Sequence, residues 1–260
     1  MKRRQRLACA STPEGDELVL WQWDQVFQIE INGLGLMSSR SYGSEEALGR
    51  LVVENLAQAS GKRPLQILVG GLGMGYTLRA LLDALDEKGL GANAAVEVAE
   101  VSEAVVDWNR SHLGHLAQHP LEDPRVRLRV EDVARCLQAP QSTYDAVVLD
   151  VDNGPEALTL ESNGSLYSRR GLGRLHRALI VGGWLALWSA SPSQAFEDKL
   201  RKVGFRARSV MVRGRYGAAG KAPKGARHVI FLARKIASQG PYAGQGRRPK
   251  KNQPRAKGRR

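Results

Sequence analysis

Short apolar runs rich in β-branched residues alternate with amphipathic helical segments from residue 65 onward. The runs are ILVGG, AVEVAEV, RVRLRV, YDAVVLD, GGWLALWS, ARSVMVR and HVIFLARK. Apolar strands separated by helices are typical of a parallel sheet with both faces covered. We therefore predict an α/β domain over residues 61–235 with a doubly wound, mainly parallel seven-stranded sheet. Residues 213–228, between the last two runs, lack periodicity and fit a loop or an antiparallel hairpin.

The residues before this domain predict a smaller appendage. Residues 17–37 alternate apolar and polar positions in two short runs, and Asn32-Gly33 joins them with a dipeptide typical of tight turns. Ser44 is then a suitable helix N-cap. The apolar positions behind it have helical spacing and are Leu48, Leu51, Val52 and Leu56. We therefore predict a small β-hairpin and a linking helix over residues 17–60.

Positive charge is concentrated at the two ends of the chain. The formal net charge is +13; four basic residues lie within residues 1–6, and eight lie within residues 236–260, where no acidic residue occurs. The body between is nearly neutral. We expect a flexible basic N-terminus over residues 1–16 and a disordered basic tail over residues 236–260, which is rich in Gly and Pro. Such a tail suits either solubility alone or non-specific, salt-sensitive binding of nucleic acid or an anionic membrane surface.

Cysteine usage and hydropathy favour a cytoplasmic protein. Cys9 and Cys136 lack CxxC spacing, so neither a disulfide framework nor a zinc site is indicated. Acidic residues interrupt the basic opening, and no run of about 18 apolar residues occurs, so we expect neither a signal peptide nor a membrane span. Three histidines share one helical face without further ligands, so we predict no metal; they are His112, His115 and His119.

A glycine-rich turn follows the first predicted strand of the domain. In an open doubly wound sheet, ligands bind outside the carboxyl ends of the strands. In GGLGMGYT, the glycines Gly71, Gly73 and Gly75 allow a ligand to approach backbone amides at a helix N-terminus. The second strand ends in Glu100, whose carboxylate can accept both hydroxyl hydrogens of a ribose.

Further acids follow the third and fourth strands. Asp132 is placed to accept a hydrogen bond from an adenine amino group, while Val133 and the backbone cover the ring. Asp150 and Asp152 come where the reactive sulfonium of an adenosyl ligand would lie. Each acid alone is consistent with a solvated loop or a helix cap. Their order behind the glycine turn predicts a Rossmann-like, adenosyl-binding domain of the class I S-adenosylmethionine-dependent methyltransferase type.

Two other nucleotide-binding classes fit this pattern less well. A nicotinamide-binding domain also has a glycine-rich turn and an acid after the second strand, typically about 20 residues on. Glu100 lies 25 residues after Gly75, and the acids after the third and fourth strands have no role in that scheme. The turn also lacks the Lys that precedes Ser or Thr in a P-loop.

Five segments carry a resemblance to a known family. They are GGLGMGYTLRALLD, AEVSEAVVDW, DPRVRLRVEDV, YDAVVLDVDNGP and LYSRRGLGRLHRALIVGGWLALWS. In this order they resemble the spermidine synthase family, the polyamine aminopropyltransferases that share the methyltransferase fold, over about residues 20–235. The resemblance implies a transferase with S-adenosylmethionine or decarboxylated S-adenosylmethionine as co-substrate and no metal. It also implies a small-molecule acceptor, with an amine as one expected class, and leaves a homodimer open.

The resemblance also implies roles for individual residues. Glu100 becomes the ribose acid and Asp132 the adenine acid. Asp150 becomes the general base, which takes a proton from an amine that attacks the carbon beside the sulfonium. Asp152 would bind a cationic acceptor, with turn stabilisation as the alternative. Tyr167 matches an aromatic position near the mouth of the active site, and packing is an equal alternative.

Several positions depart from the family pattern. Met74 stands where the family has an acid that binds the propylamine end of the decarboxylated co-substrate. Leu48 and Gly49 align with a Tyr-Gln pair that faces the polyamine, and Val69 stands where methyltransferases typically have an acid. We therefore predict methyl or aminopropyl transfer to an unidentified acceptor. The alternative is a catalytically silent adenosyl-binding module that the basic tail docks on nucleic acid.

Overall fold

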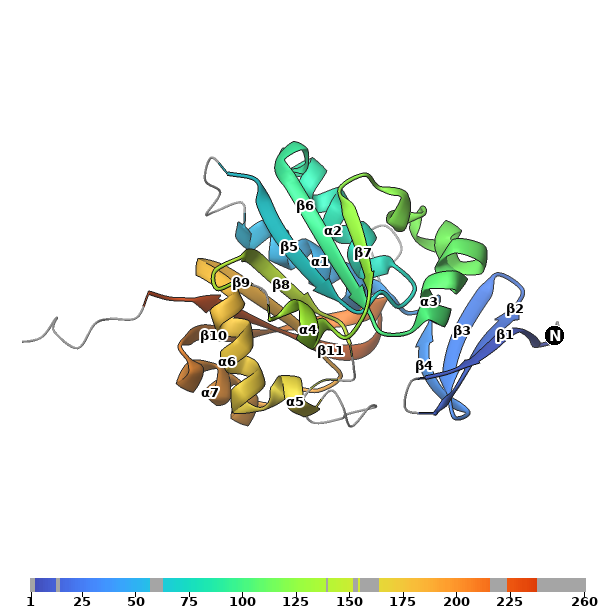
Figure 1. Ribbon diagram of the computed structural model, residues 1–260. Helices are drawn as coiled ribbons and strands as arrows, with labels where there is room; N and C mark the ends of the chain where they lie inside the picture. Colours follow the sequence, from blue (N-terminus) through green and yellow to red (C-terminus); the bar gives the residue numbers. More distant parts are fainter. Residues whose placement is uncertain are drawn as a thin grey trace, which may run out of the picture.

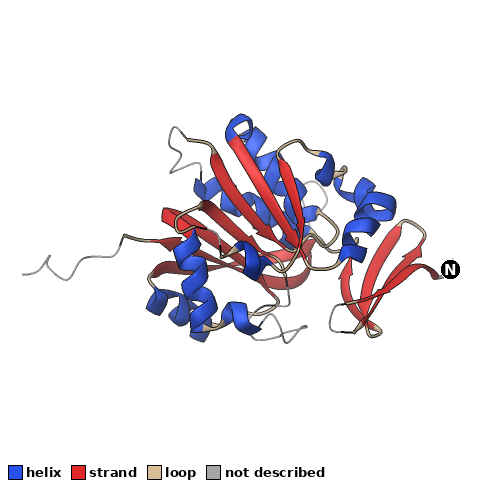
Figure 2. Ribbon diagram, in the orientation of Figure 1, coloured by secondary structure: helices blue, strands red, loops and turns tan. Residues whose placement is uncertain are grey.

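The chain forms a seven-stranded α/β domain and a four-stranded N-terminal sheet (Figures 1 and 2). The computed structural model describes residues 3–12, 15–56, 63–138, 140–151, 154, 164–215 and 224–237. The strands are β1 (Gln5–Ser11), β2 (Glu17–Trp23), β3 (Val26–Ile31), β4 (Leu34–Ser38), β5 (Leu65–Gly70), β6 (Ala94–Glu100), β7 (Val126–Val130), β8 (Tyr144–Leu149), β9 (Leu179–Ser189), β10 (Phe205–Arg215) and β11 (Lys224–Lys235). The helices are α1 (Gly43–Leu56), α2 (Tyr76–Glu87), α3 (Glu103–Trp108), α4 (Val133–Cys136), α5 (Gly164–Tyr167), α6 (Arg169–Ala178) and α7 (Gln194–Val203).

The large sheet has the strand order β10-β11-β9-β8-β5-β6-β7. The strands from β9 to β7 pair in parallel, whereas β11 is antiparallel to both β9 and β10. This confirms the predicted doubly wound, mainly parallel sheet. Strand order reverses between β5 and β8, and this switch point is where such sheets bind ligands. β10 and β11 form an antiparallel pair at the edge, and residues 216–223 between them lie outside the described part.

Each face of the large sheet is covered by its own helical layer (Figure 1). Successive side chains of a strand point to opposite faces. Thus Ile67 and Val69 of β5 pack in the cluster that contains α1 and α2. Leu68 between them packs in the cluster that contains α4, α6 and α7. All three are fully buried, and such burial stabilises the fold by about 1.5–3 kcal/mol for each large apolar side chain.

The N-terminal sheet is larger than the predicted hairpin. Its strands are antiparallel in the order β1-β2-β3-β4. Asn32 and Gly33 have φ of +49° and +77° and join β3 to β4, as their turn chemistry predicts. Residues 5–11, expected to be flexible, instead form β1, which pairs with β2. The basic opening is ordered here because the Arg4 guanidinium lies 4.1 Å from the Trp21 ring and bonds Glu30.

Helix α1 links the two parts and approaches α2 closely. Leu48, Val52 and Leu56 are buried along it, as the helical spacing predicts. A Cβ at Gly49 would lie only 2.5 Å from the Thr77 carbonyl oxygen, so the α2 backbone passes directly beside α1. This close crossing brings the first turn of α1 next to the end of β8 and the start of α2.

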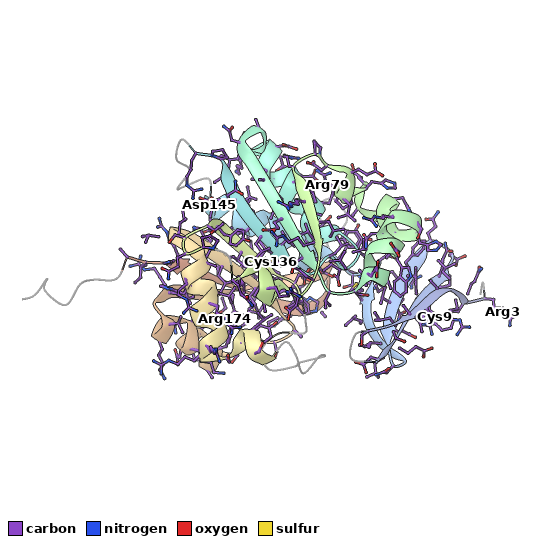
Figure 3. All side chains as sticks on the ribbon, in the orientation of Figure 1. Arg3, Cys9, Arg79, Cys136, Asp145 and Arg174 are labelled. Carbon is purple, nitrogen blue, oxygen red and sulfur yellow. The ribbon has the colours of Figure 1, made fainter. Side chains whose placement is uncertain are left out.

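Other expectations concern cysteines, membrane segments and the tail. Cys9 in the N-terminal sheet and Cys136 in α4 are free cysteines (Figure 3). None of the helices in the described ranges is long and apolar enough to cross a membrane. The basic tail from residue 238 lies outside the described ranges, and its binding to polyanions stays a prediction.

Candidate active site

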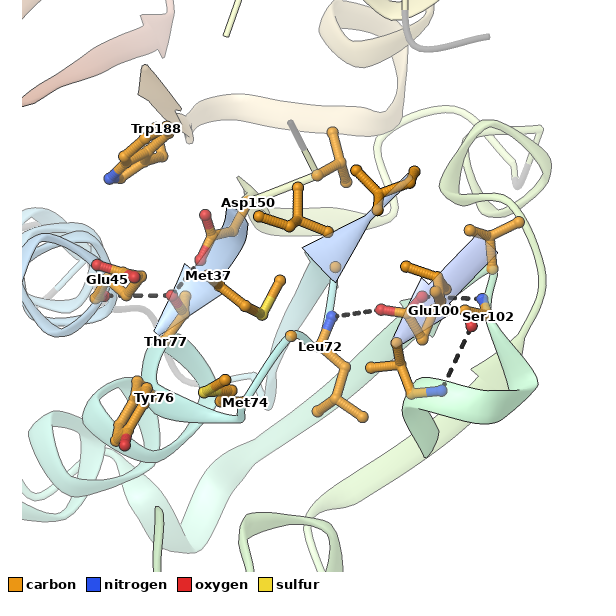
Figure 4. Close-up of a pocket in the computed structure, with 18 of the residues that line it drawn as sticks. Met37, Glu45, Leu72, Met74, Tyr76, Thr77, Glu100, Ser102, Asp150 and Trp188 are labelled. Atoms are coloured by element: carbon orange, nitrogen blue, oxygen red, sulfur yellow. Dashed lines mark hydrogen bonds between the residues drawn. The ribbon is translucent and has the colours of Figure 1, made fainter. Parts of the chain in front are cut away.

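A cavity of about 540 Å³ lies at the carboxyl ends of the parallel strands (Figure 4). This volume is typical of sites for small molecules. One wall contains residues at or just after the ends of β5, β6, β7 and β8, and they are Gly71, Glu100, Asp132 and Asp150. The opposite wall comes from the N-terminal sheet and includes Ile31, Leu36 and Met37. The four strand ends singled out in the sequence therefore meet at one cavity.

The glycine turn contacts the ends of both neighbouring strands. The Gly71 N–H donates to the Ala99 carbonyl at 2.8 Å. Gly71 has φ of +89°, and a Cβ there would lie 2.2 Å from the Asp150 carbonyl oxygen, so only glycine fits. Gly71 and Gly73 line the cavity. Gly75 instead caps the N-terminus of α2 and does not belong to the cavity wall.

Asn109 holds this turn in place and was not singled out from the sequence. Its Nδ2 donates to the Gly73 carbonyl at 2.8 Å and to the Val105 carbonyl at 2.9 Å. Asn109 is 3% exposed and begins a π-helical turn, Asn109–Leu113. Such widened turns frequently occur at functional sites. A buried Asn after the second strand is the only signal in the sequence, and it does not reveal this contact.

Glu100 is buried and fixed by backbone hydrogen bonds. One carboxylate oxygen accepts from the Leu72 N–H at 2.9 Å, and the other accepts from the Ser102 N–H at 2.8 Å. Burial raises the pKa of Glu100, and these backbone donors act in the opposite direction. Each carboxylate oxygen has a second lone pair, so this arrangement suits acceptance from the two hydroxyls of a ribose.

Asp132 serves as a helix cap and as part of the cavity wall. Its Oδ1 accepts from the Ala134 N–H at 2.8 Å at the N-terminus of α4. Val133 packs against Gly70, where a Cβ would lie 2.8 Å from Val133 Cγ2. Both Asp132 and Val133 line the cavity. The cap fixes the direction of the Asp132 side chain, which is compatible with the adenine role.

Asp150 follows β8 and is held by a residue of α2. The Thr77 hydroxyl donates to Asp150 Oδ2 at 2.6 Å. Burial raises the pKa of Asp150, while this hydrogen bond lowers it. A carboxylate with a raised pKa is a stronger base when ionised, as a proton acceptor requires.

Glu45 of α1 also lines the cavity, and the sequence analysis missed it. The Ser44 hydroxyl donates to Glu45 Oε2 at 2.6 Å, and His228 Nδ1 lies 2.8 Å from the same hydroxyl. Burial and then the charge of Asp150 raise the pKa of Glu45 to about 7. Figure 4 shows Glu45 and Asp150 on either side of Thr77.

Leu48 and Gly49, which the resemblance aligns with a polyamine-facing pair, do not line the cavity. Leu48 is 0% exposed in the core, and Gly49 packs against α2. Glu45, one helical turn earlier, faces the cavity instead. The sequence predicts only a helix N-cap at Ser44, and nothing local distinguishes Glu45 from Glu46.

Of the two predicted acceptor-binding residues, the structure describes only Tyr167, which does not line the cavity. Asp152 lies outside the described residues, so its role stays a prediction. Tyr167 is 5% exposed, and its ring packs edge-on against Phe196 at 5.9 Å between centroids. The position of Tyr167 therefore agrees with the packing role that the sequence left open as the alternative. Among the residues that the structure describes, no group of three His, Cys, Asp or Glu side chains could hold a metal ion.

The strand order and the cavity at its switch point place the chain in the S-adenosylmethionine-dependent methyltransferase fold class. Residues 51–201, more than half of the chain, match the family model described as spermine/spermidine synthase domain. The chain therefore belongs to the spermine/spermidine synthase family.

Individual relatives agree with this family. The chain is 32% identical over 152 residues to polyamine aminopropyltransferase 2 of Pseudomonas aeruginosa, covering 57% of this chain and 40% of that protein. It is 29% identical over 189 residues to a polyamine aminopropyltransferase of Prochlorococcus marinus, and the match covers 70% of this chain and 61% of that protein. The chain thus spans about half the length of these relatives.

Solved structures share the fold. A spermidine synthase from Thermotoga maritima superimposes with a TM-score of 0.66 at 15% identity, covering 90% of this chain and 74% of that one. A probable spermidine synthase from Corynebacterium glutamicum gives a TM-score of 0.60 at 16% identity, covering 90% and 81%.

Proposed function

We propose that this protein transfers the aminopropyl group of decarboxylated S-adenosylmethionine to an amine. Membership of the family and the names of its relatives support a transferase of this kind. The observation that carries the proposal is the position of Asp150. Its carboxylate lies at the switch point of the sheet, held by Thr77, on the cavity wall that also contains Glu100 and Asp132.

The chemistry requires a proton acceptor beside the reacting carbon. The nitrogen lone pair of the acceptor attacks the propyl carbon bonded to the sulfonium; the new C–N bond forms as the C–S bond breaks. The sulfur takes the bonding electron pair, which leaves neutral methylthioadenosine. Asp150 accepts the proton that the amine must lose. Glu100 and Asp132 would hold the ribose and the adenine, as their strand-end positions suggest.

Aminopropyl transfer fits the cavity better than methyl transfer does. Intact S-adenosylmethionine carries a carboxylate next to its ammonium group, and the strongest partner for this carboxylate is a positively charged side chain. Among the described residues that line the cavity, none is Lys or Arg. The decarboxylated donor needs no such partner. No observation on the described residues favours a catalytically silent module docked on nucleic acid.

Replacing Asp150 by Asn tests the assignment of the base. Because Asn can still accept from the Thr77 hydroxyl but cannot take a proton, we expect D150N to lower kcat by about 10²- to 10⁴-fold. Its affinity for the donor should fall much less, within about tenfold. Turnover is measured by mass spectrometry of the aminopropylated products that form when 1,4-diaminobutane and related diamines are offered as acceptors. Affinity for the donor is measured by calorimetric titration.

D83N is the matched control. Asp83 is an acid on α2 that pairs with Arg79 away from the cavity, so this variant should keep full turnover. Retained turnover in D150N would exclude Asp150 as the base. A methylated product in place of an aminopropylated one would contradict the proposed donor.

A further inference from the structure

The cavity wall is acidic, although the chain is strongly basic. Four carboxyl groups line it, and among the described lining residues there is no Lys or Arg. The acids are Glu45, Glu100, Asp132 and Asp150. The net charge of the chain is +13, so the cationic side chains lie elsewhere. A cavity whose wall carries charges of one sign attracts ligands whose charge has the opposite sign. The cavity therefore suits a cation.

Two of these acids lie together, at the end of the cavity away from Glu100 (Figure 4). Thr77 lies between the two residues, because its hydroxyl is 2.6 Å from Asp150 Oδ2 and 3.3 Å from the backbone carbonyl oxygen of Glu45. The surrounding wall is largely apolar and includes Met37, Met74 and Trp188. Two carboxylates in apolar surroundings cannot both ionise without a free-energy penalty. A bound cation would remove this penalty.

We propose that Glu45 is the specificity-determining residue of the cavity, and that its carboxylate binds the primary ammonium end of the aminopropyl donor beside Asp150. This inference rests on the proposed function. The glycine turn presents no charged side chain at this end of the cavity, where it contributes Met74, so α1 supplies the charge instead. The intact donor would place its carboxylate against Glu45 and Asp150, and like charges would repel it.

The orientation of Glu45 is set from a distant strand. Ser44 is fully buried, and its hydroxyl donates to Glu45 Oε2. His228 of β11 lies 2.8 Å from that hydroxyl, and its ring packs 4.7 Å from the ring of Trp188. This chain of contacts fixes the carboxylate before a ligand arrives, which lowers the entropy lost on binding.

Binding of an ammonium group should release a proton. The titratable groups around Glu45 are Asp150 after β8, Glu46 beside it on α1, Tyr76 at the start of α2 and, through Ser44, His228 on β11. Burial and the Asp150 charge raise the pKa of Glu45 to about 7. A bound cation favours the ionised carboxylate and lowers this pKa again.

Calorimetric titration of three ligands against three proteins tests the assignment. The ligands are decarboxylated S-adenosylmethionine, S-adenosylmethionine and the neutral methylthioadenosine; the proteins are the full-length chain, E45Q and E46Q. We expect the unaltered chain to prefer the decarboxylated donor by at least 100-fold over the intact one. E45Q should lose 10- to 100-fold in affinity for the decarboxylated donor and most of its preference, yet bind methylthioadenosine within twofold.

Glu46 provides the matched control. It is the neighbouring acid on α1 and does not line the cavity, so E46Q should bind all three ligands within twofold of the unaltered chain. Titrations at pH 7 in buffers of different ionisation enthalpy should show proton release with the decarboxylated donor, and E45Q should release fewer protons.

Each other outcome is decisive. An E45Q protein that keeps both the affinity and the preference for the decarboxylated donor would overturn the role of Glu45 while leaving the adenosyl site standing. If the unaltered chain binds none of the ligands, the proposed function itself fails. If E45Q also loses methylthioadenosine, E45D decides: it retains the charge, so a restored preference supports the assignment and an absent one contradicts it.

Discussion

Glu45 makes the stability of the ligand-free protein depend on pH. Its pKa is raised from 4.5 to about 7 on folding, by burial and then by Asp150. Between these values the folded chain binds more protons than the unfolded chain, so the contribution of Glu45 to stability decreases as pH rises from about 4.5 to 7. Above pH 7, the folded protein carries the full penalty of the ionised pair.

E45Q should remove this penalty. The quantity to compare is the free energy of unfolding of E45Q minus that of the unaltered chain. We expect this difference to be more positive at pH 8 than at pH 5 by roughly 1–3 kcal/mol. Urea denaturation without ligand at the two pH values measures this difference. E46Q, whose Glu46 also has a raised pKa but does not line the cavity, serves as the control and should show a smaller change. An equal difference for E45Q at both pH values would contradict the raised pKa.

Residues that follow strands could be predicted as site residues, whereas Glu45 could not. Glu100 ends an apolar run, Asp132 and Asp150 follow one within two residues, and parallel strands bring their carboxyl ends to one edge. Glu45 follows no strand of the large sheet. Its position depends on a backbone contact between Gly49 and Thr77, and such long-range packing leaves no local pattern. The contact of Asn109 with the glycine turn and the core position of Tyr167 also depend on long-range packing, so no local pattern predicts them.

At the scale of elements, the crossing of α1 and α2 positions the acid pair. A Cβ at Gly49 would lie 2.5 Å from the Thr77 carbonyl oxygen and 2.7 Å from the Leu81 nitrogen. Because both contacts are backbone atoms, the helices must separate to accept a methyl group. Thr77 contacts Asp150, and Glu45 lies on the first turn of α1, so any separation moves the two carboxylates relative to each other.

Gly49→Ala should therefore affect both stability and binding. Although Ala favours helix by about 1 kcal/mol, we expect a net loss of roughly 1–3 kcal/mol in the free energy of unfolding because the crossing is overpacked. Affinity for the decarboxylated donor should fall at least tenfold. Gly173→Ala in α6 is the control, because a Cβ there meets only the end of Arg177, at 3.7 Å, and should be neutral or stabilising. Unchanged donor affinity in G49A would contradict the idea that the crossing of α1 and α2 positions the acid pair for binding.

Element prediction succeeded where burial on both faces imposes long apolar runs. The inner strands of the large sheet could be recognised in this way, whereas the partly exposed edge strands β7 and β10 were recognisable from apolar residues that alternate with arginines. β1 was missed because its sequence, QRLACAS, follows basic residues and alternates only weakly. Its order comes from pairing with β2 and from Arg4 over Trp21. These tertiary contacts outweigh the local composition.

At the scale of the molecule, the cavity joins two parts that share a core. Leu20 and Ile29 of the N-terminal sheet are buried in one cluster with Met74 and Tyr76 of the glycine turn and α2. Tyr42 also stacks on Tyr76 with ring centroids 4.1 Å apart. A ligand that fills the cavity therefore contacts both parts, and its binding energy stabilises the whole chain.

This linkage should make ligand-induced stabilisation depend on pH. A fixed excess of decarboxylated S-adenosylmethionine raises Tm according to its affinity, and that affinity should rise by up to about tenfold per pH unit below pH 7 as Glu45 ionises, or about 1.4 kcal/mol. We therefore expect a larger increase in Tm at pH 8 than at pH 6. Thermal scans with methylthioadenosine, which lacks the ammonium group, should show a similar increase at both values. E45Q should lose most of the pH dependence, whereas an E45Q response identical to that of the unaltered chain would assign the dependence to Asp150 alone.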